Sequence, residues 1–217
     1  GGGSGHEPAF LGYVGKGLAD AAAIGNVFAS PSPDPIVDAT KAINSGKGVI
    51  YMYGNYAGDI MNFDMAAEMC QMGDITVKTV LVTDDIASAP LENKSERRGV
   101  AGDFYVFKIA GAAADVGMEL DDVCRLAEKA NDMTISMGVA LGPCSLPHTL
   151  EPSFVLEDNE MEIGLGIHGE AGVRKGNLQS ADEITTELME NILNEINGSN
   201  KVSVLVNGLG STPLMEL

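Results

Sequence analysis

The sequence predicts an α/β protein with two α/β domains whose sheets are mostly parallel or mixed. Short apolar runs that close on Gly or Asp alternate with segments of helical periodicity, which is the pattern of strands joined by helices. The 27 glycines and the 5% aromatic content suit many tight turns and disfavour an all-β sandwich. Hydrophobic residues make up 45% of the chain, enough for a sizeable core. We expect a first domain over residues 1–133, incomplete at its N-terminus, and a second over 134–217, incomplete at its C-terminus.

Buried strands are predicted where apolar and β-branched residues form short runs, at 48–54, 76–85 and 203–210. Residues 59–73, between the first two runs, have helical spacing and end on a glycine. A strand, a helix and a strand in so short a stretch predict a βαβ unit and a parallel sheet. Ligands bind beyond the carboxyl ends of such strands, where the segment Asn-Tyr-Ala-Gly-Asp at 55–59 falls.

Four methionines repeat along the predicted helix at 59–73, and we expect this stripe to belong to the core. The stripe consists of Met61, Met65, Met69 and Met72. Two further helices are predicted within 102–133, with Asp121 and Asp122 in the first turn of the second one, where acidic residues favour the helix dipole.

The pattern of the sequence changes near residue 133, from helical periodicity to short strands and turns. A strand and a proline-rich turn are predicted within 135–149, followed by strand material broken by glycines over 154–172. An amphipathic helix is predicted over 180–196. Ser180 and Glu183 have the spacing of a capping box at its start.

The charge and the cysteines restrict the function classes. The formal charge is −18, from 31 acidic and 13 basic residues, and so negative a surface repels nucleic acid and anionic membranes. It also argues against a free nucleotide held mainly by this chain. Three distant cysteines without a CxxC pair predict buried, reduced thiols in a cytoplasmic protein and neither a disulfide framework nor a zinc site. No apolar run approaches the roughly 20 residues that span a bilayer.

Two of the three histidines, His6 and His168, are flanked by glycines, which leave room for a ligand beside an imidazole. A metal site is disfavoured because neither histidine has partners at helical ligand spacing. A serine hydrolase is disfavoured because GGGSGH is not a GxSxG elbow. These residues therefore suggest a histidine nucleophile or acid–base group with Asp59 as its carboxylate partner. A structural role for each histidine, and a helix-capping role for Asp59, stay open; His148 is expected in a loop.

Other charged motifs have simpler interpretations. The paired Arg97 and Arg98 are expected on a solvated face, with an acidic partner or an anionic group as the alternative. The acidic pair Asp84 and Asp85 is also expected to face water, with magnesium binding as the alternative. The Gly-Lys-Gly at 15–17 does not complete a P-loop, so the chain shows no nucleotide site of its own.

Seven blocks, in order along the chain, resemble the substrate-binding K subunit or K domain of the dihydroxyacetone kinases. They are GGGSGHEPAFLGYVGKG, FASPSPD, NYAGDIMNF, ERRGVAGD, VALGPCSLP, DNEMEIGLGIHGEAG and LVNGLGSTPLMEL. The resemblance covers essentially the whole chain, and the joint occurrence of these blocks is very specific.

The resemblance implies two α/β domains with the substrate between them. It implies that His168 binds the carbonyl carbon of dihydroxyacetone as a hemiaminal. The turn Gly3-Ser4-Gly5 and His6 would contact the substrate, and Asp59 would hold a hydroxyl and assist proton transfer.

The resemblance also bears on cofactors and partners. This chain would bind no cofactor or metal, because ADP or ATP with Mg would be carried by a separate L subunit or domain. A phosphotransferase-system carrier that recharges ADP, or direct use of ATP, would supply the phosphoryl group. A homodimer is expected for the family.

One position departs from the family pattern, which commonly has a lysine where this chain has Gly54. Losing that cation from the site leaves two alternatives besides a dihydroxyacetone kinase. The chain would act on another short ketose such as a tetrulose, with extra carbons in the vacated space, or it would be a dihydroxyacetone-sensing transcriptional coactivator.

Overall fold

The structure is a computed structural model that describes residues 1–146, 149, 151–196, 201–210 and 212–217. It has the α/β fold that the sequence predicts, divided into two compact units. The first unit comprises Gly1–Thr83 and Gly99–Thr134, and the second comprises Asp84–Arg98 and Ile135–Leu217. The two-domain boundary at residues 133 and 134 stays a prediction. The sequence contains no signal that 84–98 groups with the C-terminal unit.

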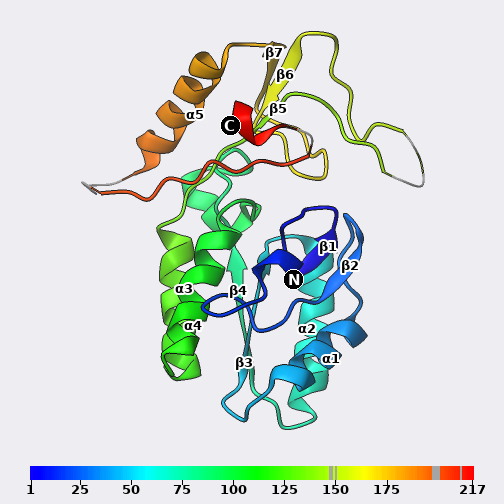
Figure 1. Ribbon diagram of the computed structural model, residues 1–217, viewed down its shortest axis with the longest axis vertical. Helices are drawn as coiled ribbons and strands as arrows, with labels where there is room; N and C mark the ends of the chain where they lie inside the picture. The colour runs from blue at the N-terminus through cyan, green and yellow to red at the C-terminus, as the bar shows by residue number, and fades with distance from the viewer. Residues whose placement is uncertain (147–148, 150, 197–200, 211) are drawn as a thin grey trace. The chain divides into compact units, whose positions relative to one another are not determined.

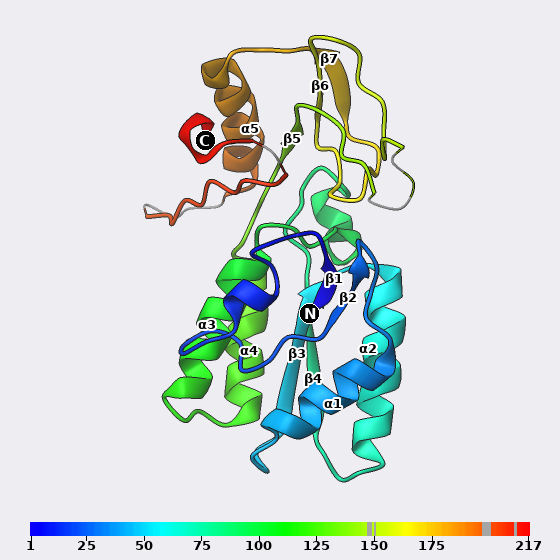
Figure 2. The ribbon, with the colours of Figure 1, turned by 45° about the vertical axis from the view of Figure 1, so that its right-hand side comes forward.

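The first unit is built around two parallel strands, β3 and β4, which run side by side between the helix pairs α1/α2 and α3/α4 (Figures 1 and 2). Its elements are β1 (Gly2–Ser4), a 3₁₀ turn (Leu11–Tyr13), β2 (Ile24–Val27), α1 (Pro33–Ile43), β3 (Val49–Gly54), α2 (Ala57–Gln71), β4 (Val77–Val82), α3 (Asp103–Asp115) and α4 (Leu120–Asp132). The register pairs Val49 with Val77 and Gly54 with Val82, and β1 pairs with β2, also in parallel. The predicted βαβ unit and the two helices of 102–133 are therefore confirmed.

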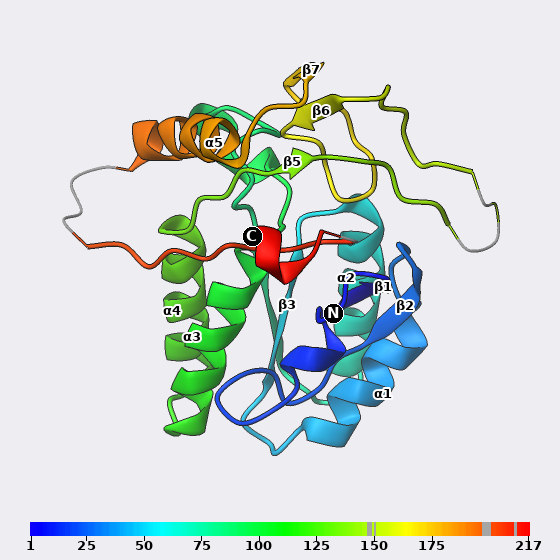
Figure 3. The same ribbon diagram turned by 45° about the horizontal axis from the view of Figure 1, so that its top comes forward.

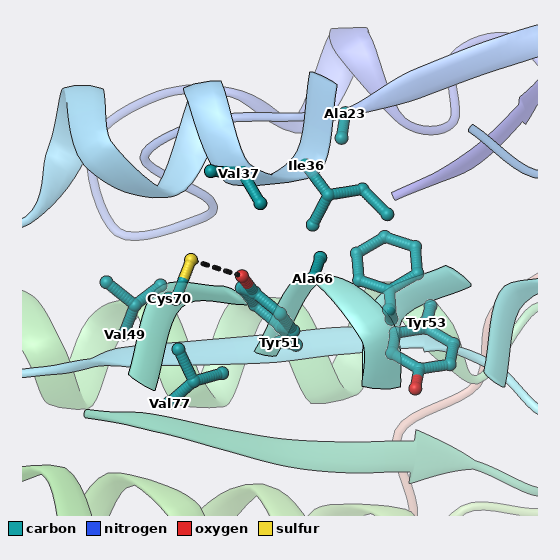
Figure 4. Close-up of a cluster of buried hydrophobic side chains, with 10 residues drawn as sticks. Ala23, Ile36, Val37, Val49, Tyr51, Tyr53, Ala66, Cys70 and Val77 are labelled. Carbon is teal, nitrogen blue, oxygen red and sulfur yellow. Dashed lines mark hydrogen bonds between the residues drawn. The ribbon is translucent and has the colours of Figure 1, made fainter. Parts of the chain in front are cut away.

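Two apolar clusters stabilise this unit, one on each side of the β3–β4 pair. The first, shown in Figure 4, brings side chains of α1 and α2 against β3. Within it, the Tyr51 hydroxyl hydrogen-bonds to Thr40 Oγ1 at 2.7 Å and lies 3.6 Å from Cys70 Sγ, so the buried hydroxyl is satisfied. The second cluster contains Val80, Val82, Val106, Ala110, Ala113, Val123, Ala127 and Ala130, from β4, α3 and α4.

The prediction that the methionine stripe is core is wrong. Helix α2 buries Phe63, Ala66 and Cys70, whereas the methionines lie on its exposed face, with Met61 62% and Met72 81% exposed. Both sets of residues have helical spacing, so periodicity alone did not identify which face packs on the sheet.

The second unit is a small antiparallel sheet with one long helix, α5 (Figure 3). Its elements are a 3₁₀ segment (Leu91–Glu96), β5 (Val139–Ala140), β6 (Glu160–Ile163), β7 (Arg174–Asn177), α5 (Ala181–Glu195) and a 3₁₀ turn (Leu214–Glu216). The central strand β6 buries Met161 and Ile163. Ser180 and Glu183 form the predicted capping box at the start of α5, with the Glu183 amide donating to Ser180 Oγ at 3.3 Å.

Three further predictions are corrected. Residues 203–210 form no strand, and Val204 is 67% exposed, since the run pairs with no strand of the described residues. Arg97, Arg98, Asp84 and Asp85 do not face water, because they pair with groups of the second unit. Cys70 and Cys124 are buried free thiols as predicted, but Cys144 is only half-buried. His148 lies outside the described residues. Among the described residues, no helix is long and apolar enough to cross a membrane.

Candidate functional site

The glycine-rich turn at the start of the chain requires its glycines for packing. A Cβ at Gly3 would lie 2.6 Å from the backbone nitrogen of Ala29, and one at Gly5 would lie 2.8 Å from the Phe28 ring. Gly5 also has φ +93°, a conformation that side chains disfavour. Gly3 and Ser4 belong to β1, and the Ser4 carbonyl accepts a hydrogen bond from the Phe28 amide at 2.9 Å. The turn is thus a built feature of the fold and not an inert linker.

His6 follows this turn and is buried. Its imidazole stacks on Phe28, with ring centroids 4.8 Å apart and an interplanar angle of 20°. Its backbone carbonyl accepts from the Ala9 amide at 3.0 Å. The aromatic face of Phe28 and the tight turn therefore restrict the orientation of the ring.

Asp59 lies in the first turn of α2, where the positive end of the helix dipole stabilises a carboxylate. Asp59 is half-buried and lies close to Tyr53. Burial raises the pKa of the Tyr53 hydroxyl, and the carboxylates of Asp64 and Asp59 raise that pKa further. A Cβ at Gly1 would lie 3.0 Å from Cζ of Phe63, a side chain of α2. The residue before β1 therefore packs against α2, the helix that carries Asp59.

Gly54 is the last residue of β3 and is buried. A Cβ there would lie 3.0 Å from the Gly99 carbonyl oxygen and 3.0 Å from Tyr56 Cε2, and the Tyr56 hydroxyl donates to that same oxygen at 3.1 Å. The space beside Gly54 is thus occupied by Tyr56 and Gly99. The missing lysine does not leave an empty volume next to the backbone at this position.

His168 lies in a tight turn of the second unit. The Gly169 amide donates to the Gly166 carbonyl at 3.0 Å, and the Gly166 amide donates to the Glu170 carbonyl at 2.8 Å. The imidazole side chain is 26% exposed, so it is not sealed in the core. This exposure meets the main requirement for a histidine that acts on a ligand.

Glu170 lies against the His168 ring and its backbone. Its Oε1 lies 3.2 Å from His168 Nδ1, and its Oε2 accepts from the His168 amide at 3.0 Å. Although burial opposes the shift, the His168 imidazole and the Glu170 and His168 backbone amides lower the pKa of the Glu170 carboxyl to about 2. An ionised carboxylate only accepts, so the contact favours the tautomer of the neutral ring that has its proton on Nδ1 and its lone pair on Nε2. Such an imidazole can attack an electrophilic carbon.

The sequence did not single out Glu170. It follows His168 by two residues, and the available signal was the His-Gly-Glu spacing, which a tight turn converts into a side-chain contact. In the first unit the Gly3–Gly5 turn packs against Phe28 and Ala29, Asp59 lies in the first turn of α2, and Gly54 lies at the end of β3. His168 belongs to the second unit.

Metal-binding clusters were sought among the residues that the structure describes. Among the described residues, no group of three or more His, Cys, Asp or Glu side chains is arranged to hold a metal ion.

Comparison with known proteins places this chain in a family. The PTS-dependent dihydroxyacetone kinase 2, dihydroxyacetone-binding subunit DhaK, of Listeria innocua is 55% identical over 100% of this chain and 65% of its own length. The L-erythrulose 1-kinase of Mycolicibacterium smegmatis is 48% identical over 100% of this chain and 39% of its own length. The chain thus spans less than two thirds of these relatives.

A solved structure has the same fold. The dihydroxyacetone kinase operon co-activator Dha-DhaQ superposes with a TM-score of 0.89 at 39% identity, covering 100% of this chain and 67% of that one. The family described as the Dak1 domain matches residues 1–217. The chain therefore belongs to the Dak1 domain family.

Proposed function

We propose that this chain is the ketose-binding part of a dihydroxyacetone-type kinase, in which His168 holds the substrate covalently through its carbonyl carbon. The observation that carries the proposal is the contact between His168 Nδ1 and the Glu170 carboxylate at 3.2 Å. It favours the tautomer with a lone pair on Nε2, the form that a nucleophilic imidazole needs. The DhaK subunit of Listeria innocua, at 55% identity, supports the substrate class.

The covalent step is a reversible addition. The Nε2 lone pair of His168 forms a bond to the ketone carbon, and the π electrons of the C=O bond move to oxygen, which takes a proton from solvent. The imidazole becomes cationic, and the Glu170 carboxylate beside Nδ1 compensates that charge. No atom leaves, so the adduct contains the whole ketose, and the reverse step returns it unchanged.

Residues of the first unit would serve the hydroxyl groups of the same substrate. We assign Asp59, in the first turn of α2, as the base that accepts the proton of the hydroxyl to be phosphorylated, because a carboxylate can take up a proton from a hydroxyl group. His6, held against Phe28, and backbone groups of the Gly3-Ser4-Gly5 turn would hydrogen-bond the substrate. Gly54 would contribute its backbone in place of the family lysine.

The phosphoryl group would come from a partner. The net charge of −18 supports a nucleotide held elsewhere, because polyphosphate and a negative surface repel each other. We propose an L subunit or domain that carries ADP or ATP with Mg, recharged by a phosphotransferase-system carrier where the subunits are separate. A homodimer of this chain is part of the same proposal.

Covalent binding also explains selectivity for a very small substrate. Few contacts are available on a triose, and contacts of that number discriminate weakly between a ketone and the corresponding polyol. A bond to the carbonyl carbon cannot form with glycerol at all. The chemistry of His168 would therefore select the ketone.

The test is NMR of the purified chain with dihydroxyacetone labelled with ¹³C at its carbonyl carbon. The expected result is a new resonance of a tetrahedral carbon bonded to nitrogen, at the expense of the ketone signal. His168→Gln should remove it, and glycerol should give no corresponding signal.

A tetrahedral resonance that persists in His168→Gln would overturn the assignment of the nucleophile. Its absence in the unsubstituted chain would overturn covalent binding. Circular dichroism of both proteins, with equal helical signal, ensures that the comparison is between folded chains.

The choice among short ketoses depends on the surroundings of Gly54. The M. smegmatis L-erythrulose 1-kinase, at 48% identity, favours a tetrulose as an alternative substrate. Tyr56 and Gly99 fill the space beside Gly54, however. The surroundings of Gly54 therefore do not specifically favour the longer carbon chain of a tetrulose. The same NMR measurement with erythrulose compares the two: the substrate is the ketose that forms the adduct at the lower concentration.

A second candidate is a regulatory paralogue that binds dihydroxyacetone and activates transcription. The likeness to the co-activator Dha-DhaQ, with a TM-score of 0.89, favours it. Phosphoryl transfer from a nucleotide-loaded L subunit to the bound ketose discriminates the two. Transfer supports the kinase, whereas adduct formation without transfer supports the regulator.

A further inference from the structure

The turn that carries His168 is enclosed between two glycines with left-handed backbone conformations. Gly164 has φ +76° and Gly169 has φ +89°. We call residues 164–170 the histidine turn. Its internal hydrogen bonds fix its shape, but its position in the unit must come from contacts with other segments.

One side chain from another segment, Arg98, contacts both ends of the histidine turn. Its Nη2 donates to the Gly164 carbonyl at 2.9 Å, and its Nη1 lies 4.0 Å from Glu170 Oε2. Only 11% of its side chain is exposed. A planar guanidinium can serve such separate acceptors at once, because its donors point in fixed and different directions.

Gly166 allows this close approach. A Cβ on Gly166 would lie 2.1 Å from Glu170 Oε2 and 2.2 Å from Arg98 Nη1. The glycine thus provides the space in which the two charged groups meet against the turn. The absence of a side chain at 166 has a specific geometric reason.

Arg98 is itself held rigidly. Its Nε donates to Asp85 Oδ2 at 2.8 Å, and its backbone amide donates to Ser88 Oγ at 2.9 Å. Asp85 is 4% exposed and accepts from the Ala87 amide at 3.1 Å. Burial raises the pKa of the Asp85 carboxyl, against the opposite effect of Arg98. The aspartate and the arginine therefore form a buried, hydrogen-bonded pair beside the histidine turn.

We propose that Arg98, oriented by Asp85, is a positioning residue for His168: it fixes the histidine turn and the Glu170 carboxylate so that the Nε2 lone pair is directed at the ketone. This inference rests on the proposed function of His168. It assigns to Arg98, the second of the paired arginines, a task that neither the motif nor the histidine alone reveals. Arg98 does not touch the reacting atoms and acts only through the turn.

The test combines two measurements on Arg98→Lys. The first is the adduct equilibrium with labelled dihydroxyacetone, which should weaken on the order of 10- to 100-fold, as when a supporting group lets a reactive group move. The second is the ¹⁵N chemical shifts of His168, which report how the proton is shared between Nδ1 and Nε2. We expect a shift toward the other tautomer. A purely structural role would leave that ratio unchanged in the folded protein.

Arg174→Lys is the matched control, because Arg174 is an exposed arginine of the same unit that pairs with Glu187. It should change neither measurement. Gly166→Ala is the second variant, since it pushes Arg98 and Glu170 away from the turn without removing a charge. It should weaken the adduct as Arg98→Lys does, and it decides the matter where Arg98→Lys fails to fold.

The inference would be overturned if Arg98→Lys kept both the adduct affinity and the tautomer ratio of the unsubstituted chain. It would also be overturned if Gly166→Ala kept the adduct affinity of the unsubstituted chain. The unsubstituted chain distinguishes this failure from that of the proposed function. If it forms no adduct, the covalent mechanism is wrong, and the His168 tautomer in Arg98→Lys alone then decides whether Arg98 positions the ring.

Discussion

The two units of this chain are stabilised by different kinds of buried group. The first has paired parallel strands and two clusters of buried aliphatic and aromatic side chains. In the second, the short sheet buries Met161 and Ile163, and the largest fully buried side chain of the described residues is a charged one, Arg97. The comparison teaches that hydrophobic patterning shows how the first unit folds, whereas charge pairs between distant residues decide much of the second.

The largest expected effect is on the Arg97–Glu195 pair. Arg97 is 1% exposed and binds both carboxylate oxygens of Glu195, at 2.9 and 2.7 Å, near the C-terminal end of α5. Arg97→Ala leaves that carboxylate without its partner and should cost about 3–5 kcal/mol of unfolding free energy. Hydrogen exchange should show faster opening of α5, with α1–α4 unchanged.

The double variant Arg97→Met with Glu195→Met separates charge from packing. It should recover much of the loss, because two apolar side chains need no partner. Equal protection of α5 amides in Arg97→Ala and in the unsubstituted chain would contradict the idea that this pair holds the helix.

The next largest effect is expected in the first unit, at a position where backbone atoms pack closely and no charged pair is involved. A Cβ at Gly99 would lie 2.5 Å from Gly54 Cα and 2.5 Å from the Val82 carbonyl oxygen, both of them backbone atoms. Gly99→Ala should therefore cost about 1–3 kcal/mol by overpacking, measured by denaturant unfolding. Gly58→Ala is the control: its Cβ would meet only Ser30 Cβ, at 3.6 Å, and stability should not fall. Equal effects of the two substitutions would refute this account.

The same contrast explains what could be predicted from the sequence. Local periodicity and turn residues were sufficient to predict several elements. These are the β3–α2–β4 unit, the helices α3 and α4, and the capping box of α5. The face of α2 was assigned wrongly, since methionines and buried residues repeat with the same period. The strand expected at 203–210 is absent, because a strand also needs a partner, which a local pattern does not specify.

The candidate site divides in the same way. Flanking glycines and a strand end identified the candidate residues His6, His168, Gly3–Gly5 and Asp59. The roles of these residues stay predictions. Glu170 was missed, and Arg98 was noticed but expected on a solvated face. The contact between Arg98 and the Gly164 carbonyl joins residues 66 positions apart, and no spacing rule in the sequence reports such a contact.

A smaller effect is expected from Glu170, whose carboxylate is partly exposed. Its pKa in the folded chain, about 2, lies below the ordinary value of 4.5. The ionised form therefore favours folding; the contribution is complete above about pH 4.5 and is lost as the pH falls through about 2. Urea unfolding of Glu170→Gln and the unsubstituted chain should show a constant difference near neutral pH that shrinks in that window. A difference that does not vary with pH would contradict the assigned ionisation.

The smallest effect should come from a second arginine–glutamate pair of the same unit. Arg174 binds Glu187 of α5 and also Gln179, yet its side chain is 42% exposed. An exposed pair gains little over hydration, so Arg174→Gln should cost less than about 1 kcal/mol, and less still in high salt. Arg97 and Arg174 both pair with glutamates of one helix and differ chiefly in burial. Equal losses of unfolding free energy in the two variants would mean that pairing itself, and not burial, stabilises this unit.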